Sequence, residues 1–470
     1  MKVAFCSAEV FPFAKTGGLA DVCGTLPLEL EKQDVPVSIF MPGYKTIDRQ
    51  KFAFRKVRDE LSVGIWGKNI QVYLIEHDAY FGREGIYGDQ YGIYHDNLER
   101  FQYFCDQTLK IVKSLNEHFD VVHCHDWHAA LIPVYLKERY PQDDFYRKIK
   151  TVLTIHNLAY QGDFPEDLFY KLNLNGDHGV WDRLTKYGKI NILKAGIVYS
   201  DEVTTVSQRY AEEIQTEAYG CGLQDDLHRR QNRLVGILNG LDHTVWDPQK
   251  DTFLAKKYSS KNLLSAKEEN KRQLQERLGL TPSPKIPLFG FVGRLVHQKG
   301  IDLILEVLPE LLKEGVQVII QGIGDASYQS ALQELASRNT GRLAVLFEYN
   351  EPFAHQIYAG CDFFLMPSRF EPCGLSQMIS MRYGTLPIVF WTGGLAETVR
   401  HFSESGQGAN GLALRHYTKE DFLTVLRKAS TIYNDEVILE ELRKNAFHSD
   451  FSWKESAKEY KKLYQCLLSD

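Results

Sequence analysis

The fold is decided by one stretch of sequence, residues 288–313, which reads LFGFVGRLVHQKGIDLILEVLPELLK. Its first five residues, Leu288–Val292, form an apolar run, which is typical of a parallel strand covered on both faces. The amphipathic pattern of Asp302–Lys313 predicts a helix. Between them lies a loop with two cations, Arg294 and Lys299, each beside a glycine. The stretch therefore predicts a strand, a loop and a helix of a parallel α/β sheet.

The same alternation of short apolar runs and amphipathic stretches continues in both directions from this stretch. Repeated strand-then-helix order predicts a doubly wound α/β architecture. The other predicted strands are Val3–Ala8, Val35–Phe40, Gln71–Ile75, Val121–Cys124, Thr151–Ile155, Glu202–Val206, Leu234–Leu238, Gln317–Gln321, Leu343–Phe347, Phe363–Met366 and Leu386–Phe390.

The length of the chain indicates two domains. A chain of 470 residues is too long for one ordinary core, so two domains of roughly 200 residues each are expected. A break falls near Asn239–Pro248, and the proline-containing segment Thr281–Pro287 leads into the strands of the second half. The predicted boundary places residues 1–240 in a first Rossmann-like domain and residues 241–450 in a second.

Composition excludes several classes of protein. The net charge of -6 argues against nucleic-acid binding, which needs a basic surface. The eight cysteines are scattered without a CxxC pair, which predicts reduced thiols and a cytoplasmic protein. Met1–Phe11 reads as a buried strand and not as a signal peptide. No apolar run approaches the roughly 18 residues of a membrane span, so no membrane partner is expected.

A near-repeat suggests anion binding in both halves. Thr16–Ala20 reads TGGLA, and the same letters recur at Thr392–Ala396. Each copy follows a predicted strand and opens a predicted helix, whose free N–H groups can bind an anion; Lys15 adds a cation beside the first copy. The alternative is that both copies are tight turns without a ligand. Neither matches GxGxxG, so a nicotinamide or flavin site is not supported.

Cations and a carboxylate follow two strands of the second half. Arg294 and Lys299 suit a diphosphate, although solvated surface cations are the simpler alternative. Glu371 follows the strand Phe363–Met366 and can bind sugar hydroxyls or stabilise a cationic anomeric carbon. The alternative for Glu371 is an acid that complements a helix N-terminus. Tyr349 follows another strand and can stack on a nucleobase.

Histidines follow two strands of the first half. The run His123–His128 reads HCHDWH, and His156 ends the strand Thr151–Ile155. These residue types allow a rival interpretation, a two-metal hydrolase that activates water. The other interpretation places His125 and Asp126 at a substrate cleft and lets His123 and His128 pack.

Taken together, these residues resemble the family of bacterial glycogen synthases and plant starch synthases. That family consists of retaining glucosyltransferases of the GT-B fold, in glycosyltransferase family 5. The matching motifs run through the whole chain: Lys15–Val22, His125–His128, His156–Gly162, Asn239-Gly240, Arg294 with Gln298–Gly300, Pro367–Leu375, Thr392–Leu395 and Asp450–Trp453.

The resemblance implies a complete site in a cleft between two facing Rossmann-like domains, with a C-terminal helix, residues 451–470, that returns to the first domain. It implies four residues that act in catalysis: Glu371, Arg294, Lys299 and His156. The implied donor-binding residues are Lys15, Gly18, Asn239, Tyr349, Cys373, Gly374, Leu375, Thr392, Gly393 and Gly394. Asp21, Tyr94 and Asp126 are expected on the acceptor side.

The expected reaction is transfer of glucose from ADP-glucose to the non-reducing end of an α-1,4-glucan, with retention of configuration. The partners are therefore a nucleotide-sugar and a glycogen-like or malto-oligosaccharide acceptor. No cofactor and no metal are expected, because Arg294 and Lys299 supply the cationic charge. The alternatives are a related retaining transferase that uses UDP-glucose or a small sugar acceptor, and, more remotely, the metal-dependent hydrolase or an inactive glucan-binding scaffold.

Overall fold

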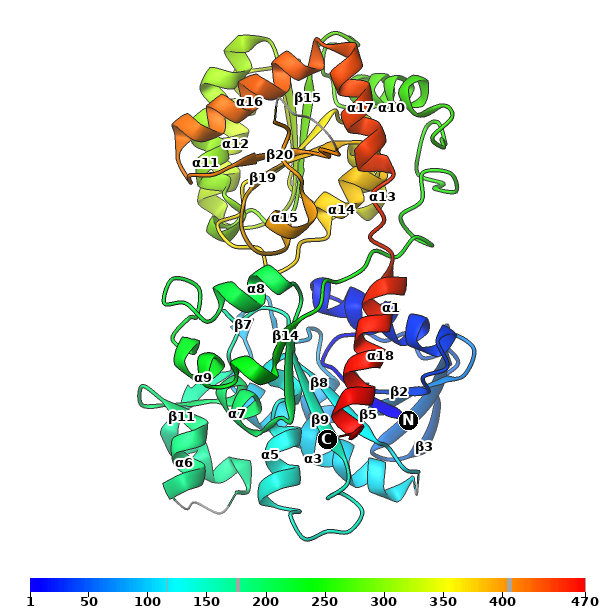
Figure 1. Cartoon of the computed structure of the whole chain (residues 1–470), viewed down its shortest axis with the longest axis vertical. Helices are drawn as coiled ribbons and strands as arrows, with labels where there is room; N and C mark the ends of the chain where they lie inside the picture. Colours follow the sequence, from blue (N-terminus) through cyan, green and yellow to red (C-terminus); the bar gives the residue numbers. More distant parts are fainter. Residues whose placement is uncertain (116, 175–177, 404–407, 470) are drawn as a thin grey trace. The chain divides into compact units, whose positions relative to one another are not determined.

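The computed structural model describes residues 1–115, 117–174, 178–403 and 408–469. The chain divides into two compact units: unit 1 comprises Met1–Gly240 with Trp453–Asp470, and unit 2 comprises Leu241–Ser452. Each unit has helices packed on a largely parallel sheet (Figure 1). The predicted doubly wound α/β architecture, with two Rossmann-like domains, is confirmed.

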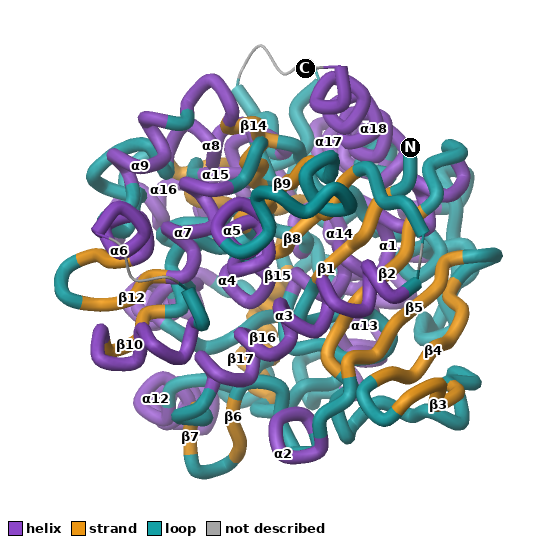
Figure 2. The backbone as a smooth tube through the Cα atoms, turned by 90° about the horizontal axis from the view of Figure 1, so that it is seen from below, coloured by secondary structure: helices purple, strands orange, loops and turns teal. Residues whose placement is uncertain are grey.

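Unit 1 is built on a nine-stranded sheet in the order β14-β13-β9-β8-β1-β2-β5-β4-β3. The strands from β14 to β5 are parallel, and β4 and β3 are added antiparallel at one edge (Figure 2). Their bounds are β1 Val3–Cys6, β2 Val37–Pro42, β3 Arg55–Arg58, β4 Leu61–Trp66, β5 Ile70–Ile75, β8 Val121–His125, β9 Lys150–Ile155, β13 Glu202–Thr205 and β14 Leu234–Gly236.

Unit 1 also contains two small antiparallel sheets and ten α-helices within the described residues. The small sheets are formed by β6 Gly88–Asp89 with β7 Gly92–Ile93, and by β10 Asp163–Pro165, β12 Lys189–Asn191 and β11 Thr185–Lys186. The helices are α1 Gly18–Lys32, α2 Asp78–Phe81, α3 Asn97–Ser114, α4 Asp126–Ala129, α5 Leu131–Glu138, α6 His178–Leu184, α7 Ile192–Tyr199, α8 Gln208–Glu213, α9 Gln224–Arg229 and α18 Trp453–Ser469.

The C-terminal helix α18 belongs to unit 1 and packs beside α1 (Figure 1). The hydroxyl of Tyr464 lies 2.7 Å from Nδ1 of His123 on β8. Ser456 donates to the carbonyl of Leu238 at 2.6 Å, and Lys461 donates to the carbonyl of Gln33 at 2.6 Å. These buried and partly buried hydrogen bonds hold the last segment of the chain on the first sheet.

Unit 2 is built on a wholly parallel six-stranded sheet in the order β17-β16-β15-β18-β19-β20. Numbered within the unit, this is the order 3-2-1-4-5-6 of a Rossmann sheet, whose direction of winding reverses between β15 and β18. The strands are β15 Leu288–Val292, β16 Gln317–Gln321, β17 Leu343–Leu346, β18 Phe363–Met366, β19 Leu386–Phe390 and β20 Leu412–Leu414.

Helices cover both faces of this sheet. Figure 1 shows α11, α12 and α16 on one side of the strands and α10, α13 and α17 on the other. Within the described residues the helices are α10 Leu263–Arg277, α11 Ile301–Leu311, α12 Ala326–Arg338, α13 Glu351–Gly360, α14 Ser376–Arg382, α15 Gly393–Thr398, α16 Lys419–Tyr433 and α17 Glu436–Phe447. The two-sided cover explains why the strands read as continuous apolar runs.

All twelve predicted strands are present, and the helix predicted at residues 302–313 forms as α11 and a short 3-10 turn, Leu312–Glu314. The missed strands include β3, which is exposed along its whole length and carries three charges, and β20, which has only three residues. Neither gives the apolar run by which a strand is recognised.

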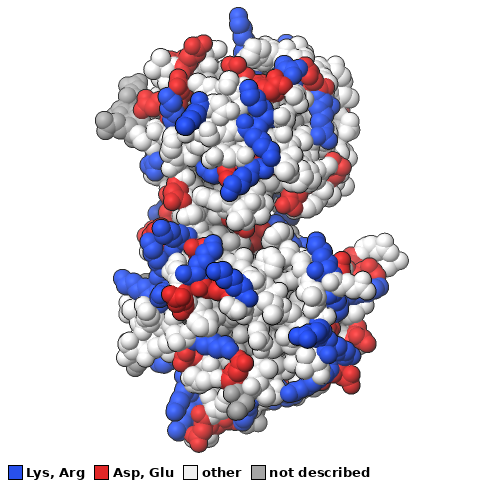
Figure 3. Space-filling view, turned by 90° about the vertical axis from the view of Figure 1, so that its right-hand side faces the viewer, with Lys and Arg blue, Asp and Glu red and all other residues white. Residues whose placement is uncertain are grey.

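Two expectations concern the whole chain: that it lacks a basic surface for nucleic acid and that it lacks a membrane-spanning helix. On the face shown in Figure 3, Lys and Arg lie among Asp and Glu and do not form one basic stripe. Among the described residues, no helix combines the length and the apolar character needed to cross a membrane.

Candidate functional site

The loops that follow β15 and β18 meet at the carboxyl edge of the unit 2 sheet. These strands are neighbours at the point where the winding reverses, which is where open α/β sheets bind ligands. The backbone N–H of Arg369 donates to the carbonyl of Gln298 at 2.9 Å, so the two loops are directly joined. Gly300, at φ +75°, lies so close that a Cβ there would be 2.1 Å from the carbonyl oxygen of Pro367. This close approach requires the glycine.

Lys299 and Glu371 form the centre of this edge. The ammonium nitrogen of Lys299 lies 2.6 Å from Oε2 of Glu371, and the hydroxyl of Ser368 donates to the same oxygen at 3.0 Å. Glu371 is only 7% exposed, so its charge requires these partners. The structure therefore brings together a predicted catalytic carboxylate and a predicted diphosphate-binding lysine.

Arg294 lies on the same loop but is exposed. Its Nη2 donates to Oε1 of Gln298 at 3.4 Å, and Nε2 of Gln298 donates to the carbonyl of Phe370 at 3.3 Å. Gln298 thus connects the exposed cation to the segment that carries Glu371. An exposed guanidinium beside a buried carboxylate–lysine pair can bind an oxyanion from solvent.

The second TGGLA copy lies against the Glu371 segment. A Cβ on Gly393, whose φ is +45°, would lie 2.0 Å from the carbonyl oxygen of Glu371, and one on Gly394 would lie 2.1 Å from that of Cys373. The N–H of Gly394 donates to the carbonyl of Glu371 at 3.1 Å. These glycines allow two backbone segments to pack together, a purpose that the sequence pattern did not reveal.

The remaining predicted donor residues of unit 2 differ in exposure. Cys373 and Thr392 are buried, Gly374 and Leu375 are half-buried, and Tyr349 is 76% exposed. The exposed ring of Tyr349 is accessible for stacking on a flat ligand. Cys373 and Gly374 both hold Nε2 of Gln377 through their carbonyls, at 3.0 Å each.

In unit 1 the first TGGLA copy is held by a buried carboxylate, Glu9. Its oxygens accept hydrogen bonds from the backbone N–H of Gly17 at 3.1 Å, from the hydroxyl of Thr16 at 2.7 Å and from the hydroxyl of Tyr87 at 2.6 Å. A Cβ on Gly17 would meet no atom within 4 Å. Gly17 therefore borders open space, unlike Gly393 and Gly394, and helix α1 begins at the next residue, Gly18.

Two predicted residues beside this loop form an ion pair. The ammonium nitrogen of Lys15 lies 2.7 Å from Oδ1 of Asp21, one turn into α1. The pair resembles Lys299 with Glu371: in each unit, a lysine at a strand-end loop is held by an acidic side chain.

Glu9, Ser368 and Gln298 are not among the predicted site residues, although Ser368 and Gln298 fall within motifs that carry the resemblance. The available signal for Glu9 was a carboxylate in an otherwise apolar run directly before a glycine-rich loop. Ser368 and Gln298 act by orienting Glu371 and Arg294, and only the three-dimensional contacts reveal this.

Asp126 and His156 lie at the ends of β8 and β9, which are neighbours in the unit 1 sheet. Asp126 has a φ of +54°, which is strained for a residue with a side chain, and its Oδ1 accepts from the N–H of His156 at 2.7 Å. Burial raises the pKa of Asp126 to about 7. Burial lowers the pKa of His156 to about 3, so its ring is neutral at neutral pH.

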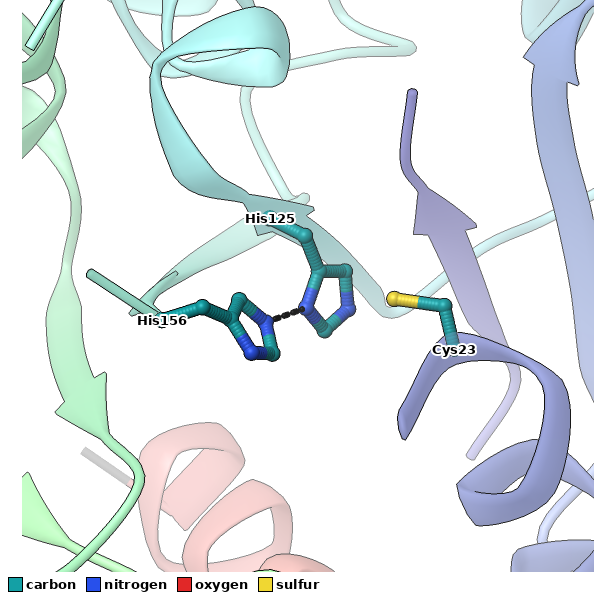
Figure 4. A group of neighbouring side chains, drawn as sticks. All are labelled: Cys23, His125 and His156. Atoms are coloured by element: carbon teal, nitrogen blue, oxygen red, sulfur yellow. Dashed lines mark hydrogen bonds between the residues drawn. The ribbon is translucent and has the colours of Figure 1, made fainter. Parts of the chain in front are cut away.

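The histidine-rich run does not converge on one point. His123 is fully buried, with Nε2 2.6 Å from the hydroxyl of Thr154, and His128 stacks on Tyr87. Both therefore pack, as the second sequence interpretation expects. His125 instead reaches His156, with 2.9 Å between Nδ1 and Nε2 (Figure 4).

The last two predicted residues lie apart from these contacts. Asn239 follows β14 and is 6% exposed, and its Oδ1 has no hydrogen-bond partner in the part of the chain that the structure describes. Tyr94 lines an open cavity of about 310 Å³ beside the β6–β7 hairpin. Its ring lies under the guanidinium of Arg83, at 4.9 Å.

The buried histidines predict that acid destabilises unit 1. Burial lowers the pKa of His123, His125, His128 and His156 in the folded state, so below about pH 6.5 the unfolded chain binds protons that the folded chain does not. The free energy of unfolding should fall by up to about 1.4 kcal/mol per pH unit for each such histidine. Asp126 offsets the effect of one histidine between about pH 4 and 7. Because its pKa is raised, its carboxyl binds a proton in the folded state at a pH where the unfolded chain does not, and this stabilises the folded state as the pH falls.

Urea denaturation at pH 7.5, 6.5 and 5.5 measures this slope. A His128→Gln variant removes one of the four groups and should show a shallower loss of stability at low pH. Equal slopes for the two proteins would show that His128 takes up protons in the folded state.

Comparisons with known proteins agree with this arrangement in both units. The family described as the starch synthase catalytic domain matches residues 2–229, and the family described as glycosyl transferases group 1 matches residues 273–448. The first match contains the Lys15–Gly18 loop with His125 and His156, and the second contains Arg294, Lys299 and Glu371.

Whole-length relatives are also found. The chain is 40% identical to a glycogen synthase of Thermodesulfovibrio yellowstonii, over 100% of this chain and 98% of that protein. It is 41% identical to a glycogen synthase of Geotalea daltonii, over 100% and 99%. Among solved structures, the catalytic domain of starch synthase IV from Arabidopsis thaliana, bound to ADP and acarbose, is 31% identical with a TM-score of 0.89, over 100% of this chain and 99% of that one. A sucrose-phosphate synthase from Thermosynechococcus elongatus, 16% identical with a TM-score of 0.63, shares the fold.

Proposed function

Because this chain belongs to the family of glycogen and starch synthases and is a glycosyltransferase, we propose that its donor is ADP-glucose and its acceptor the non-reducing end of an α-1,4-glucan. The proposal depends on the Lys299–Glu371 ion pair, which lies where the winding of the unit 2 sheet reverses between β15 and β18. Arg294 lies on the same loop as Lys299. The ADP bound to the starch synthase IV structure supports the choice of nucleotide.

In this proposal Arg294 and Lys299 bind the diphosphate of the donor. Without donor, Lys299 neutralises Glu371 at 2.6 Å. A diphosphate offers the ammonium a stronger partner, and Glu371 then turns to the glucose. Lys15 and the N–H of Gly18 support the diphosphate in the same way, because Asp21 holds Lys15 until an anion arrives.

Glucose recognition is assigned to buried polar groups. Glu371 and the backbone of Cys373, Gly374 and Leu375 bind its hydroxyls, and Thr392, Gly393 and Gly394 support that segment. Asn239, whose buried Oδ1 lacks a partner among the described residues, and His156 also contact the sugar. Tyr349 stacks on the base through its exposed ring.

The acceptor is assigned to unit 1. Asp21, Tyr94 and Asp126 are the proposed acceptor-side residues. Tyr94 supports this through the open cavity that it lines, since an aromatic wall beside polar groups suits a sugar ring.

The reaction proceeds on one face of the sugar. The glucosyl–phosphate bond breaks with oxocarbenium character, and the leaving phosphate accepts the proton of the attacking glucan hydroxyl. Arg294 and Lys299 stabilise the negative charge that develops on the diphosphate. The α configuration of the donor is retained in the product.

We also propose that the protein acts in the cytoplasm. All eight cysteines are free thiols, and six of them are buried. Free thiols of this number suit a reducing compartment.

A donor assay tests the proposed substrate. The protein is incubated with glycogen and either ADP-glucose or UDP-glucose, and glucose incorporation is measured. The proposal predicts a kcat/KM at least about tenfold higher for ADP-glucose, a difference of about 1.4 kcal/mol in transition-state binding. A preference for UDP-glucose would reject the assigned nucleotide, and no incorporation from either donor would reject the proposed reaction.

Removal of divalent metal should not lower the rate. Arg294 and Lys299 supply the positive charge that a metal supplies in other transferases. The rate with ADP-glucose and glycogen is compared before and after dialysis against a chelator. A loss of activity that Mg²⁺ or Mn²⁺ restores would contradict the proposal.

A further inference from the structure

A buried group of soft metal ligands lies beside the proposed site. Cys23, His125 and His156 each offer one donor atom, and these atoms all lie within 4.8 Å of one another; this is the one such group of His, Cys and acidic side chains within the described residues. The three residues come from α1 and from the ends of β8 and β9. In Figure 4 the Cys23 sulfur faces the His125 ring on the side opposite His156.

An unused ligand atom points to a function for this group. Nε2 of His125 is buried and has no hydrogen-bond partner among the described residues, and the side chain of His125 is 0% exposed. An unpaired buried ring nitrogen costs free energy. A cation that accepts its lone pair removes that cost.

The donor atoms are more widely spaced than the ligand atoms of a bound zinc ion. Zinc binds sulfur at about 2.3 Å and imidazole nitrogen at about 2.0–2.1 Å, so tetrahedral ligand atoms lie roughly 3.3–3.7 Å apart. The three donor atoms are spread over up to 4.8 Å, so the side chains must move closer together to bind zinc, and the Nδ1–Nε2 hydrogen bond between the two histidines must break.

We propose that Cys23, His125 and His156 form a zinc-binding site, with water or a substrate oxygen as the fourth ligand. A thiolate with two imidazoles favours Zn²⁺ over the hard cations Mg²⁺ and Ca²⁺. Binding forms one Zn–S and two Zn–N bonds and releases the thiol proton of Cys23 to solvent. The half-buried His156 provides the route of entry.

Zinc at this site should inhibit glucosyl transfer. This consequence rests on the proposed function, because zinc would hold the His156 ring away from the donor sugar. The metal is therefore an inhibitor and not a cofactor, and dialysis against a chelator should still not lower the rate of transfer.

Cobalt titration tests the site without relying on activity. All proteins carry Cys221→Ser and Cys466→Ser, which remove the two exposed thiols, and are first reduced and freed of metal. Co²⁺ binding is followed by the thiolate-to-cobalt charge-transfer band and the visible bands of tetrahedral cobalt, and Zn²⁺ is then added as competitor. The compared variants are Cys23→Ala and Cys361→Ala, the second a buried thiol of unit 2 as matched control.

The parent protein and Cys361→Ala should each bind one equivalent of Co²⁺ and show the thiolate-to-cobalt charge-transfer band. Zn²⁺ should then displace the cobalt and abolish the band. Affinity should fall at least about 100-fold in Cys23→Ala, and half-inhibition of transfer should need at least about tenfold more zinc. Equal metal affinity in Cys23→Ala, or a bound cobalt without a thiolate band, would overturn the site. Binding through Cys23 without inhibition would overturn the inhibitory role. A protein that binds metal in this way but transfers no glucose would refute the proposed function and leave the site standing.

Discussion

Replacing Glu371 with alanine should reduce kcat for glucosyl transfer by about 10³-fold or more, a loss of about 4 kcal/mol of transition-state stabilisation. The carboxylate is 7% exposed and oriented by Lys299 and Ser368, so it is pre-organised to interact with the sugar as charge develops. Because the proposed diphosphate ligands remain, ADP-glucose should still bind. Single-turnover rates and calorimetric titration with ADP-glucose measure the two quantities.

Glu76 provides a matched control in unit 1. Its carboxylate is also mostly buried, pairs with Arg49 at 2.8 Å and accepts from the hydroxyl of Ser62 at 2.7 Å. Glu76→Ala should lower stability but leave kcat within about threefold of the parent value, because neither Glu76 nor Arg49 is proposed to contact the donor or the acceptor. Normal turnover in Glu371→Ala would remove Glu371 from the mechanism.

Replacing Lys299 with alanine should lower kcat/KM for ADP-glucose by about 10²–10³-fold, with a raised KM for the donor. The lysine is proposed to bind the diphosphate in the ground state and to stabilise it further as it leaves. Steady-state kinetics at saturating glycogen measure both parameters.

Loss of Lys299 also leaves the Glu371 carboxylate without its cation, so a control must separate stability from binding. Lys171 forms a partly buried ion pair with Glu99, and Lys171→Ala should alter stability but not the donor KM. An unchanged donor KM in Lys299→Ala would mean that the lysine only positions Glu371.

The sequence predicted the sheets because each is covered on both faces. Strands such as Leu288–Val292 and Phe363–Met366 must be apolar throughout, and that makes them recognisable. Strand β3, Arg55–Arg58, lies at the exposed edge of unit 1, where its residues carry no burial signal. Pattern reasoning therefore succeeds where burial imposes composition and fails at the edges.

The site was predictable only in part, for a related reason. Lys299 and Glu371 fall at strand ends, which parallel sheets place on one edge, so their proximity follows from the topology. The role of Glu9 depends on hydrogen bonds that no spacing encodes. Likewise, the meeting of Cys23 with His125 depends on how α1 packs on the sheet.

We propose that this chain elongates an α-glucan by single glucose units from a nucleotide-sugar. The most direct test is mass spectrometry of the products formed from ADP-glucose and a malto-oligosaccharide of defined length, with release of ADP measured in parallel. We expect a ladder of longer chains, with one ADP formed for each glucose added at the non-reducing end. Release of free glucose without longer chains, or a product built on a small sugar phosphate alone, would contradict it.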